Sequence, residues 1–172
     1  GMTNAIEKAI LAALDYETKV RDVYAEAVSK AEDETGKKVF KVLADEEQGH
    51  IDYLEDRLSV LRKTGKVEPG EVKTSIPTKQ AIKAGVQKLK RTVGREVKGA
   101  EVDLLRKALA VEEETSAFYR RMVEELPSEG KTFFRGFVAI EEGHVAIVQA
   151  EIDSVTGMGF WFDFQEFDLE AG

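Results

Sequence analysis

Two short stretches of the chain decide the fold that the sequence predicts: EEQGHID, residues 46–52, and EEGHVAI, residues 141–147. Each places a histidine three residues after a glutamate, and His50 and His144 are the only two histidines in the sequence. Residues three apart share one face of a helix. One Glu-x-x-His is common in an acidic helical protein, but two copies that use both histidines require an explanation.

The two stretches belong to a repeat of apolar stripes. Read as helices, residues 34–64 and 128–156 match at an offset of 94. The matched positions are Phe40, Leu43, Glu47, His50, Leu54 and Leu61 in the first stripe, and Phe134, Phe137, Glu141, His144, Val148 and Val155 in the second. Residues 4–31 and 100–126 match at an offset of 95, which pairs Ile10, Glu17 and Tyr24 with Leu105, Glu112 and Tyr119. The chain therefore reads as two diverged helical hairpins.

A single all-α domain over residues 1–172 accounts for this repeat, because the length suffices for one core and only three prolines interrupt the helical stretches. We expect four long helices, at about 4–31, 34–64, 100–126 and 128–156. The connection at 65–99, with a short helix at about 79–93, is far longer than a hairpin needs. It is expected to run back along the bundle, as in a ferritin-like four-helix bundle with one long crossover. An aromatic, acidic tail covers residues 157–172.

The composition excludes several classes of function. A net charge of −8 argues against nucleic acid or an anionic membrane as the main partner, since both favour basic patches. The chain has no cysteine, which excludes disulfides, zinc–cysteine sites, iron–sulfur centres and thiol catalysis. No stretch has the length of a membrane-spanning helix and no basic-then-apolar signal opens the chain. We therefore expect a cytoplasmic protein.

Polar residues interrupt the stripes at positions where the pattern calls for apolar side chains: Glu17, Glu47, His50, Glu112, Glu141 and His144. Burying an ionised carboxylate without a partner is costly or shifts its pKa until it is neutral. Basic partners could compensate, with Arg21 and Arg57 nearest in the pattern. Two divalent cations would instead neutralise four carboxylates, with two imidazoles as further ligands. Such a ligand set suits iron or manganese, and zinc can occupy it.

Four motifs carry a resemblance to a known family: YETKVRDVY (16–24), ADEEQGH (44–50), VEEETSAFY (111–119) and AIEEGH (139–144). Over about residues 5–156 the chain resembles the ferritin-like di-iron carboxylate superfamily, and within it the rubrerythrin-like group. Di-iron bundles of this kind use one Glu from each of two helices and a Glu-x-x-His from each of the other two. The resemblance implies two iron ions per chain. It also implies the metal ligands and catalytic residues Glu17, Glu47, His50, Glu112, Glu141 and His144, with Glu47 and Glu141 bridging.

The sequence departs from this group in two ways. Full-length rubrerythrins carry a rubredoxin-like domain whose iron is bound by cysteines, and this chain has none. Their third helix often supplies an extra glutamate three residues after the first, where this chain has Thr115. A mechanism that exchanges a ligand with that glutamate is therefore not expected. Electrons would have to come from a separate donor protein.

The side chains next to the six candidates fall into two sets. Tyr24 and Tyr119 share a helix face with Glu17 and Glu112, so we expect their hydroxyls to hydrogen-bond ligand carboxylates. Solvated faces are expected for Glu46, Glu113, Glu114 and Glu142. Glu46 is also an alternative ligand, although its counterpart in the second repeat is Ile140.

The expected function is a redox enzyme that reduces hydrogen peroxide with electrons from an external donor protein. The alternatives are a ferroxidase or iron-storage protein, with dioxygen or peroxide as oxidant, and a non-catalytic bundle with a structural metal. A hydroxylase of a quinone or lipid is a weaker alternative, since no membrane face is evident. The aromatic tail favours packing on the bundle or on a second subunit, and hence a homodimer or larger homo-oligomer.

Overall fold

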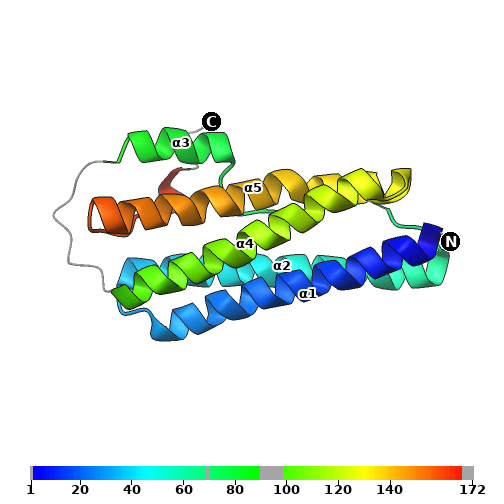
Figure 1. The fold of residues 1–172 in the computed structure, drawn as a ribbon, viewed down its shortest axis with the longest axis horizontal. Coiled ribbons are helices and arrows are strands. Elements are labelled where there is room, and N and C mark those ends of the chain that lie inside the picture. Colours follow the sequence, from blue (N-terminus) through cyan, green and yellow to red (C-terminus); the bar gives the residue numbers. More distant parts are fainter. Residues whose placement is uncertain (1, 69, 90–98, 168–172) are drawn as a thin grey trace.

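The computed structural model describes residues 2–68, 70–89 and 99–167, and these form a helical bundle (Figure 1). Its elements are α1 (Met2–Lys30), α2 (Glu34–Thr64), α3 (Lys79–Gln87), α4 (Gly99–Glu125), α5 (Ser128–Gly157) and the 3-10 helix η1 (Phe164–Phe167). Within these ranges there is no β-strand. The prediction of an all-α fold is therefore confirmed.

The four long helices pack as two hairpins. Helix α1 lies against α2, α4 lies against α5, and α1 also packs on α4. Figure 1 shows α2 and α4 running in the same direction, each antiparallel to its hairpin partner. The expected crossover at 65–99 includes residues 69 and 90–98, which lie outside the described residues. Its described part contains α3, which packs on α5 and η1.

Local signals set the helix ends. The carboxylate of Asp33 accepts a 2.9 Å hydrogen bond from Gly36 N and caps α2, which ends where Gly65 adopts a left-handed φ of 74°. The short helix differs from its expected span of 79–93, because α3 ends at Gln87 with Lys88 as its C-cap. Residues 90–93 of that expectation lie outside the described residues. Helix α1 begins at Met2, two residues before its expected start.

The bundle has two hydrophobic cores with a polar layer between them. One core contains Val20, Leu43, Leu105 and Ile147, and the other contains Ala13, Leu54, Phe118 and Phe137. In each long helix the two cores are separated by the turns that carry the candidate metal ligands. The polar layer therefore lies in the middle of the bundle, where water is excluded from both sides.

The described part of the aromatic tail, up to Phe167, packs on the bundle's own core. Trp161, Phe162, Phe164 and Phe167 are all buried there. Gly36 permits this packing, because a Cβ at that position would lie 2.6 Å from the Trp161 ring. The tail aromatics thus do not form an exposed surface, and the homodimer stays a prediction. None of the helices in the described ranges is both long and apolar enough to cross a membrane.

Candidate metal centre

Each long helix contributes to the polar layer from its core-facing side. Helices α1 and α4 each supply one carboxylate, and α2 and α5 each supply a glutamate and a histidine one turn apart. None of these six residues is more than 1% exposed: Glu17, Glu47, His50, Glu112, Glu141 and His144. The structure thus brings together all six residues that the stripes singled out.

The six side chains form two overlapping groups. Glu17, Glu47, His50 and Glu141 form the first, and Glu47, Glu112, Glu141 and His144 form the second. Within each group one potential ligand atom per residue lies within 4.8 Å of all the others. Glu47 and Glu141 belong to both groups, so two cations bound here would share two carboxylates.

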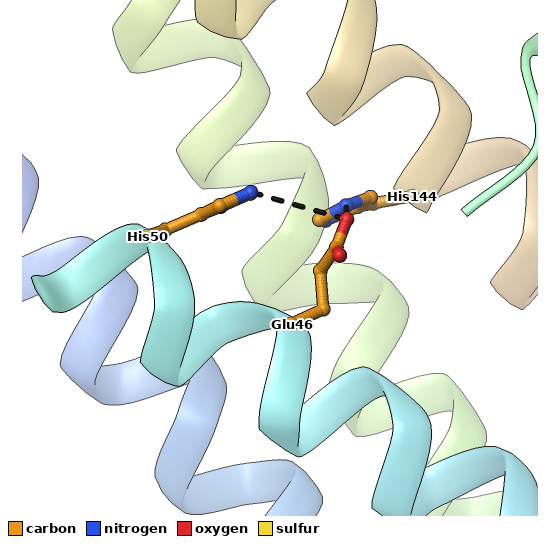
Figure 2. A group of neighbouring side chains, drawn as sticks. All are labelled: Glu46, His50 and His144. Atoms are coloured by element: carbon orange, nitrogen blue, oxygen red, sulfur yellow. Dashed lines mark hydrogen bonds and ion pairs between the residues drawn. The ribbon is translucent and has the colours of Figure 1, made fainter. Parts of the chain in front are cut away.

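The two imidazoles face the carboxylates in the same way. His50 Nδ1 lies 3.4 Å from Glu17 Oε2, and His144 Nδ1 lies 3.3 Å from Glu112 Oε2. Each Nδ1 also approaches Glu47, at 3.6 Å and 2.8 Å respectively. The rings are nearly parallel, at 4°, with centroids 5.3 Å apart (Figure 2). Each Nδ1 also lies 3.7 Å from Glu141. Each histidine therefore faces three carboxylates: one that belongs only to its own group, and the shared Glu47 and Glu141.

The site contains many buried polar atoms that make no hydrogen bond. They are Glu17 Oε2, both oxygens of Glu47 and of Glu141, Glu112 Oε1, both ring nitrogens of His50, and His144 Nδ1. Buried polar atoms in proteins are almost always paired, because an unpaired one loses its hydration without compensation. So many unpaired oxygen and imidazole atoms converging on one point fit a pair of divalent cations.

In the part of the chain that the structure describes, no lysine or arginine forms an ion pair with the four carboxylates. Arg21 donates to Asp22 and Gln48, and Arg57 donates to Asp56 and the main-chain oxygen of Glu68. Among the described residues, the four carboxylates form ion pairs with the two histidines only. The alternative in which Arg21 or Arg57 compensates the buried carboxylates is therefore wrong.

The clustered charges shift the pKa values strongly. Burial, together with the charges of Glu17 and Glu112, raises the pKa of Glu47 to about 8. Burial would lower the pKa of His50, but its contacts with Glu17 and Glu47 raise it to about 10. Burial would raise the pKa of Glu17, yet its contacts with Glu47 and His50 hold it at about 2. Without a cation the cluster thus retains protons, which a bound cation would displace.

Two tyrosines hold the carboxylates that the groups do not share. The Tyr119 hydroxyl donates to Glu17 Oε1 at 2.6 Å, and the Tyr24 hydroxyl donates to Glu112 Oε2 at 3.1 Å. Burial and the neighbouring carboxylate charges raise the pKa of both tyrosines well above the ordinary value. Both hydroxyls therefore keep their protons and act as hydrogen-bond donors.

The expectation of a solvated Glu46 is wrong. Its side chain is buried, and Oε2 lies 2.9 Å from His144 Nε2. Oε1 accepts hydrogen bonds from Ser75 N at 2.9 Å and Ser75 Oγ at 3.1 Å, and Thr74 Oγ1 donates to Oε2. Burial would raise the pKa of Glu46, but contacts with His144 and Thr74 lower it to about 2. The expected solvent exposure holds for Glu113, Glu114 and Glu142.

Two further buried carboxyl groups lie outside the predicted site. Glu151 accepts a 3.1 Å hydrogen bond from Phe162 N, while Glu101 accepts one of 3.2 Å from Asp33 N. The signal for Glu151 was present, since it follows His144 by seven residues on the same stripe. At the position of the absent extra glutamate, the Thr115 hydroxyl donates to Val111 O at 2.9 Å and so bonds its own helix.

A helical bundle whose central layer contains two overlapping carboxylate–histidine groups fits a di-iron carboxylate protein. The family model described as Rubrerythrin matches residues 8–152. The chain therefore belongs to the rubrerythrin family, which confirms the resemblance seen in the four motifs. Comparisons with curated proteins and with solved structures gave no match.

Proposed function

We propose that the six side chains bind two iron ions per chain and that the protein reduces hydrogen peroxide, using electrons from an external donor protein. The observation that carries this proposal is the pair of overlapping groups, which share Glu47 and Glu141. In this assignment Glu17 and His50 complete one group, while Glu112 and His144 complete the other. The oxygen and imidazole donors also suit manganese, and zinc can occupy such a site.

Bound ferrous iron would supply the redox chemistry: two electrons and two protons convert hydrogen peroxide into two molecules of water. The donor protein then returns two electrons. The chain's own residues prepare the site for this reaction. Tyr119 and Tyr24 orient the carboxylates of Glu17 and Glu112 through their hydrogen bonds. A preorganised, dry site strengthens each electrostatic contact within it.

Aromatic rings close one side of the site. The Phe137 ring lies edge-on to His50, with centroids 5.8 Å apart, and stacks on Tyr119 at 4.7 Å. Phe134 packs beside both Tyr119 and Phe137. These rings separate the polar layer from bulk water, which would otherwise compete with the carboxylates for a bound cation.

The first experiment is anaerobic loading with ferrous iron, followed by stopped-flow absorbance after mixing with peroxide or, separately, with dioxygen. We expect two iron ions per chain, fast oxidation by peroxide, slow oxidation by dioxygen, and reduction again by a donor such as a rubredoxin. Iron uptake that continues past two per chain would support storage instead. Bound iron that is inert to both oxidants would support a structural metal and contradict the proposal.

A matched pair of variants tests whether the buried layer carries the reaction. Glu141 is buried and shared by both groups, whereas its neighbour Glu142 is exposed. We expect Glu141→Gln to abolish rapid peroxide reduction and Glu142→Gln to leave it unchanged. Equal rates in the two variants would place the reaction elsewhere.

A further inference from the structure

Glu46 contacts His144 at the ring nitrogen opposite the one that faces Glu47, Glu112 and Glu141. His144 Nδ1 lies 2.8 Å from Glu47 Oε1, whereas Nε2 lies 2.9 Å from Glu46 Oε2. Figure 2 shows Glu46 reaching from α2 to His144 on α5. A neutral imidazole has one protonated nitrogen and one free for a ligand bond. If Nδ1 binds a cation, Nε2 carries the proton and Glu46 accepts its hydrogen bond.

A segment of the connection between α2 and α3 holds Glu46 in place. We call this segment, residues 72–78, the strap. Three donors from it reach the Glu46 carboxylate: Thr74 Oγ1, Ser75 N and Ser75 Oγ. The strap also passes close to α5, since a Cβ at Gly143 would lie 3.0 Å from Pro77 O. It therefore contacts α2 at Glu46 and α5 at the residue next to His144.

This arrangement serves one half of the repeat only. The position of Glu46 corresponds to Ile140 in the second hairpin, so no equivalent carboxylate comes from α5. His50 Nε2 lies 3.9 Å from Glu46 Oε2, which is too far for a hydrogen bond. Of the two histidines, His144 alone has its Nε2 paired in the structure. The two groups therefore differ: only the histidine of the group that contains His144 has a carboxylate partner at Nε2.

We propose that Glu46 is a positioning residue: it fixes the orientation and tautomer of His144, and the strap sets the metal affinity of the group that contains His144. The inference rests on the proposed function, in which His144 binds a metal ion. A carboxylate that accepts the proton of a ligating histidine orients the ring and makes it a more basic ligand. The His144 group should therefore bind its cation more tightly than the His50 group does.

Cobalt titration of the metal-free full-length chain, in competition with a chelator, tests this proposal. We expect two cobalt ions per chain with unequal affinities. Glu46→Ala should weaken one of them by about 10–100-fold, the usual effect of losing such a partner, without changing the number bound. Glu46→Gln keeps an acceptor oxygen and should recover part of the loss. Asp45→Asn, which removes an exposed carboxylate from the preceding residue, is the control and should bind as the wild type does.

A second readout follows the histidine itself. Because the chain has two histidines, a zinc-loaded sample with ¹⁵N-labelled histidine gives four ring-nitrogen signals. In the wild type we expect the Nε2 proton of one histidine to resonate downfield and to exchange slowly with solvent, because its carboxylate partner accepts its hydrogen bond. Glu46→Ala should shift this proton upfield and remove the protection, while the other ring keeps its signals. A purely structural role for Glu46 would leave both rings unchanged.

The double variant Thr74→Val/Ser75→Ala keeps Glu46 but removes the two hydroxyl donors of the strap. It should weaken the same cobalt ion and shift the same Nε2 proton, by less than Glu46→Ala does. This variant tests the proposal even if Glu46→Ala fails to fold.

Four outcomes would overturn the inference. Unchanged cobalt affinity and ring signals in the Glu46 and strap variants would show that Glu46 does not position His144. Weakening of both ions alike would show that its effect is not confined to the His144 group. Three cobalt ions in the wild type and two in Glu46→Ala would make Glu46 a ligand. A wild type that binds no metal would refute the proposed function, and the inference with it, a result distinct from the other three.

Discussion

Tyr119 on α4 donates a 2.6 Å hydrogen bond to Glu17 on α1, so each of these residues depends on a helix from the other hairpin. The reciprocal bond runs from Tyr24 on α1 to Glu112 on α4. Helices α1 and α4 meet along the bundle, and these two bonds cross that contact within the polar layer. The geometry of the proposed metal centre is therefore coupled to the docking of the two hairpins.

Tyr119→Phe should weaken metal binding, because it removes the donor that orients Glu17. We expect a loss of about tenfold or more in cobalt affinity for the group containing His50. In the metal-free protein the variant leaves Glu17 Oε1 unpaired, which costs about 1–3 kcal/mol in free energy of unfolding. Cobalt competition and urea unfolding measure the two effects. Tyr16→Phe, which removes a hydroxyl from the half-buried residue that precedes Glu17 in the sequence, is the control and should change neither quantity appreciably.

Removing a carboxylate that only one group uses should leave the other group intact. Glu112 belongs only to the group with His144, so Glu112→Ala should reduce the number of tightly bound cobalt ions from about two to one per chain. Glu47→Ala removes a shared carboxylate and should weaken both. Glu113→Ala, at the exposed neighbouring position, is the control for charge on this helix. An equal effect of Glu112→Ala and Glu47→Ala on both ions would contradict the shared arrangement.

The metal-free protein should lose stability as the pH rises from about 4.5 to about 10. Contacts with Glu17 and Glu47 raise the pKa of His50 from 6.5 to about 10, against the effect of burial. Burial raises the pKa of Glu47 from 4.5 to about 8. In this window the folded state binds more protons than the unfolded state, so unfolding becomes easier as protons are withdrawn.

Metal loading should reverse the fall in stability with rising pH, because bound cations require deprotonated ligands and bind more tightly at higher pH. Urea unfolding of the metal-free and zinc-loaded protein at a series of pH values measures both slopes. Parallel slopes in the two forms would show that the six residues do not bind the zinc.

Alanine substitution at two glycines of α2 should change the stability of the protein in opposite directions. A Cβ at Gly36 would lie 2.6 Å from the buried Trp161 ring, so Gly36→Ala should destabilise the protein by about 1–3 kcal/mol through overpacking. A Cβ at Gly49 meets nothing within 4 Å, and Gly49→Ala should stabilise the helix by about 1 kcal/mol. Thermal unfolding compares the two. Equal effects would show that the tail does not pack against Gly36.

The sequence by itself determined the four long helices, their pairing into a repeat, and the six side chains that the structure brings into one buried layer. It could do so because each property is periodic: a helix buried by neighbouring helices repeats its core positions every three to four residues. Glu17 and His144 stand out because they are polar at positions of that repeat. Their role as metal ligands stays a prediction.

Only the tertiary structure decided the surroundings of Glu46. This residue lies one position before the core position Glu47, and helical periodicity would leave it at the edge of the solvent. It is buried because the strap folds over it, and the strap is an irregular segment whose path has no period in the sequence. The packing of Trp161 likewise has no periodic signal in the sequence, because this residue of the irregular tail enters the core where Gly36 leaves room. Periodicity reports the faces that helices bury against one another, whereas contacts made by irregular segments depend on where the whole chain places them.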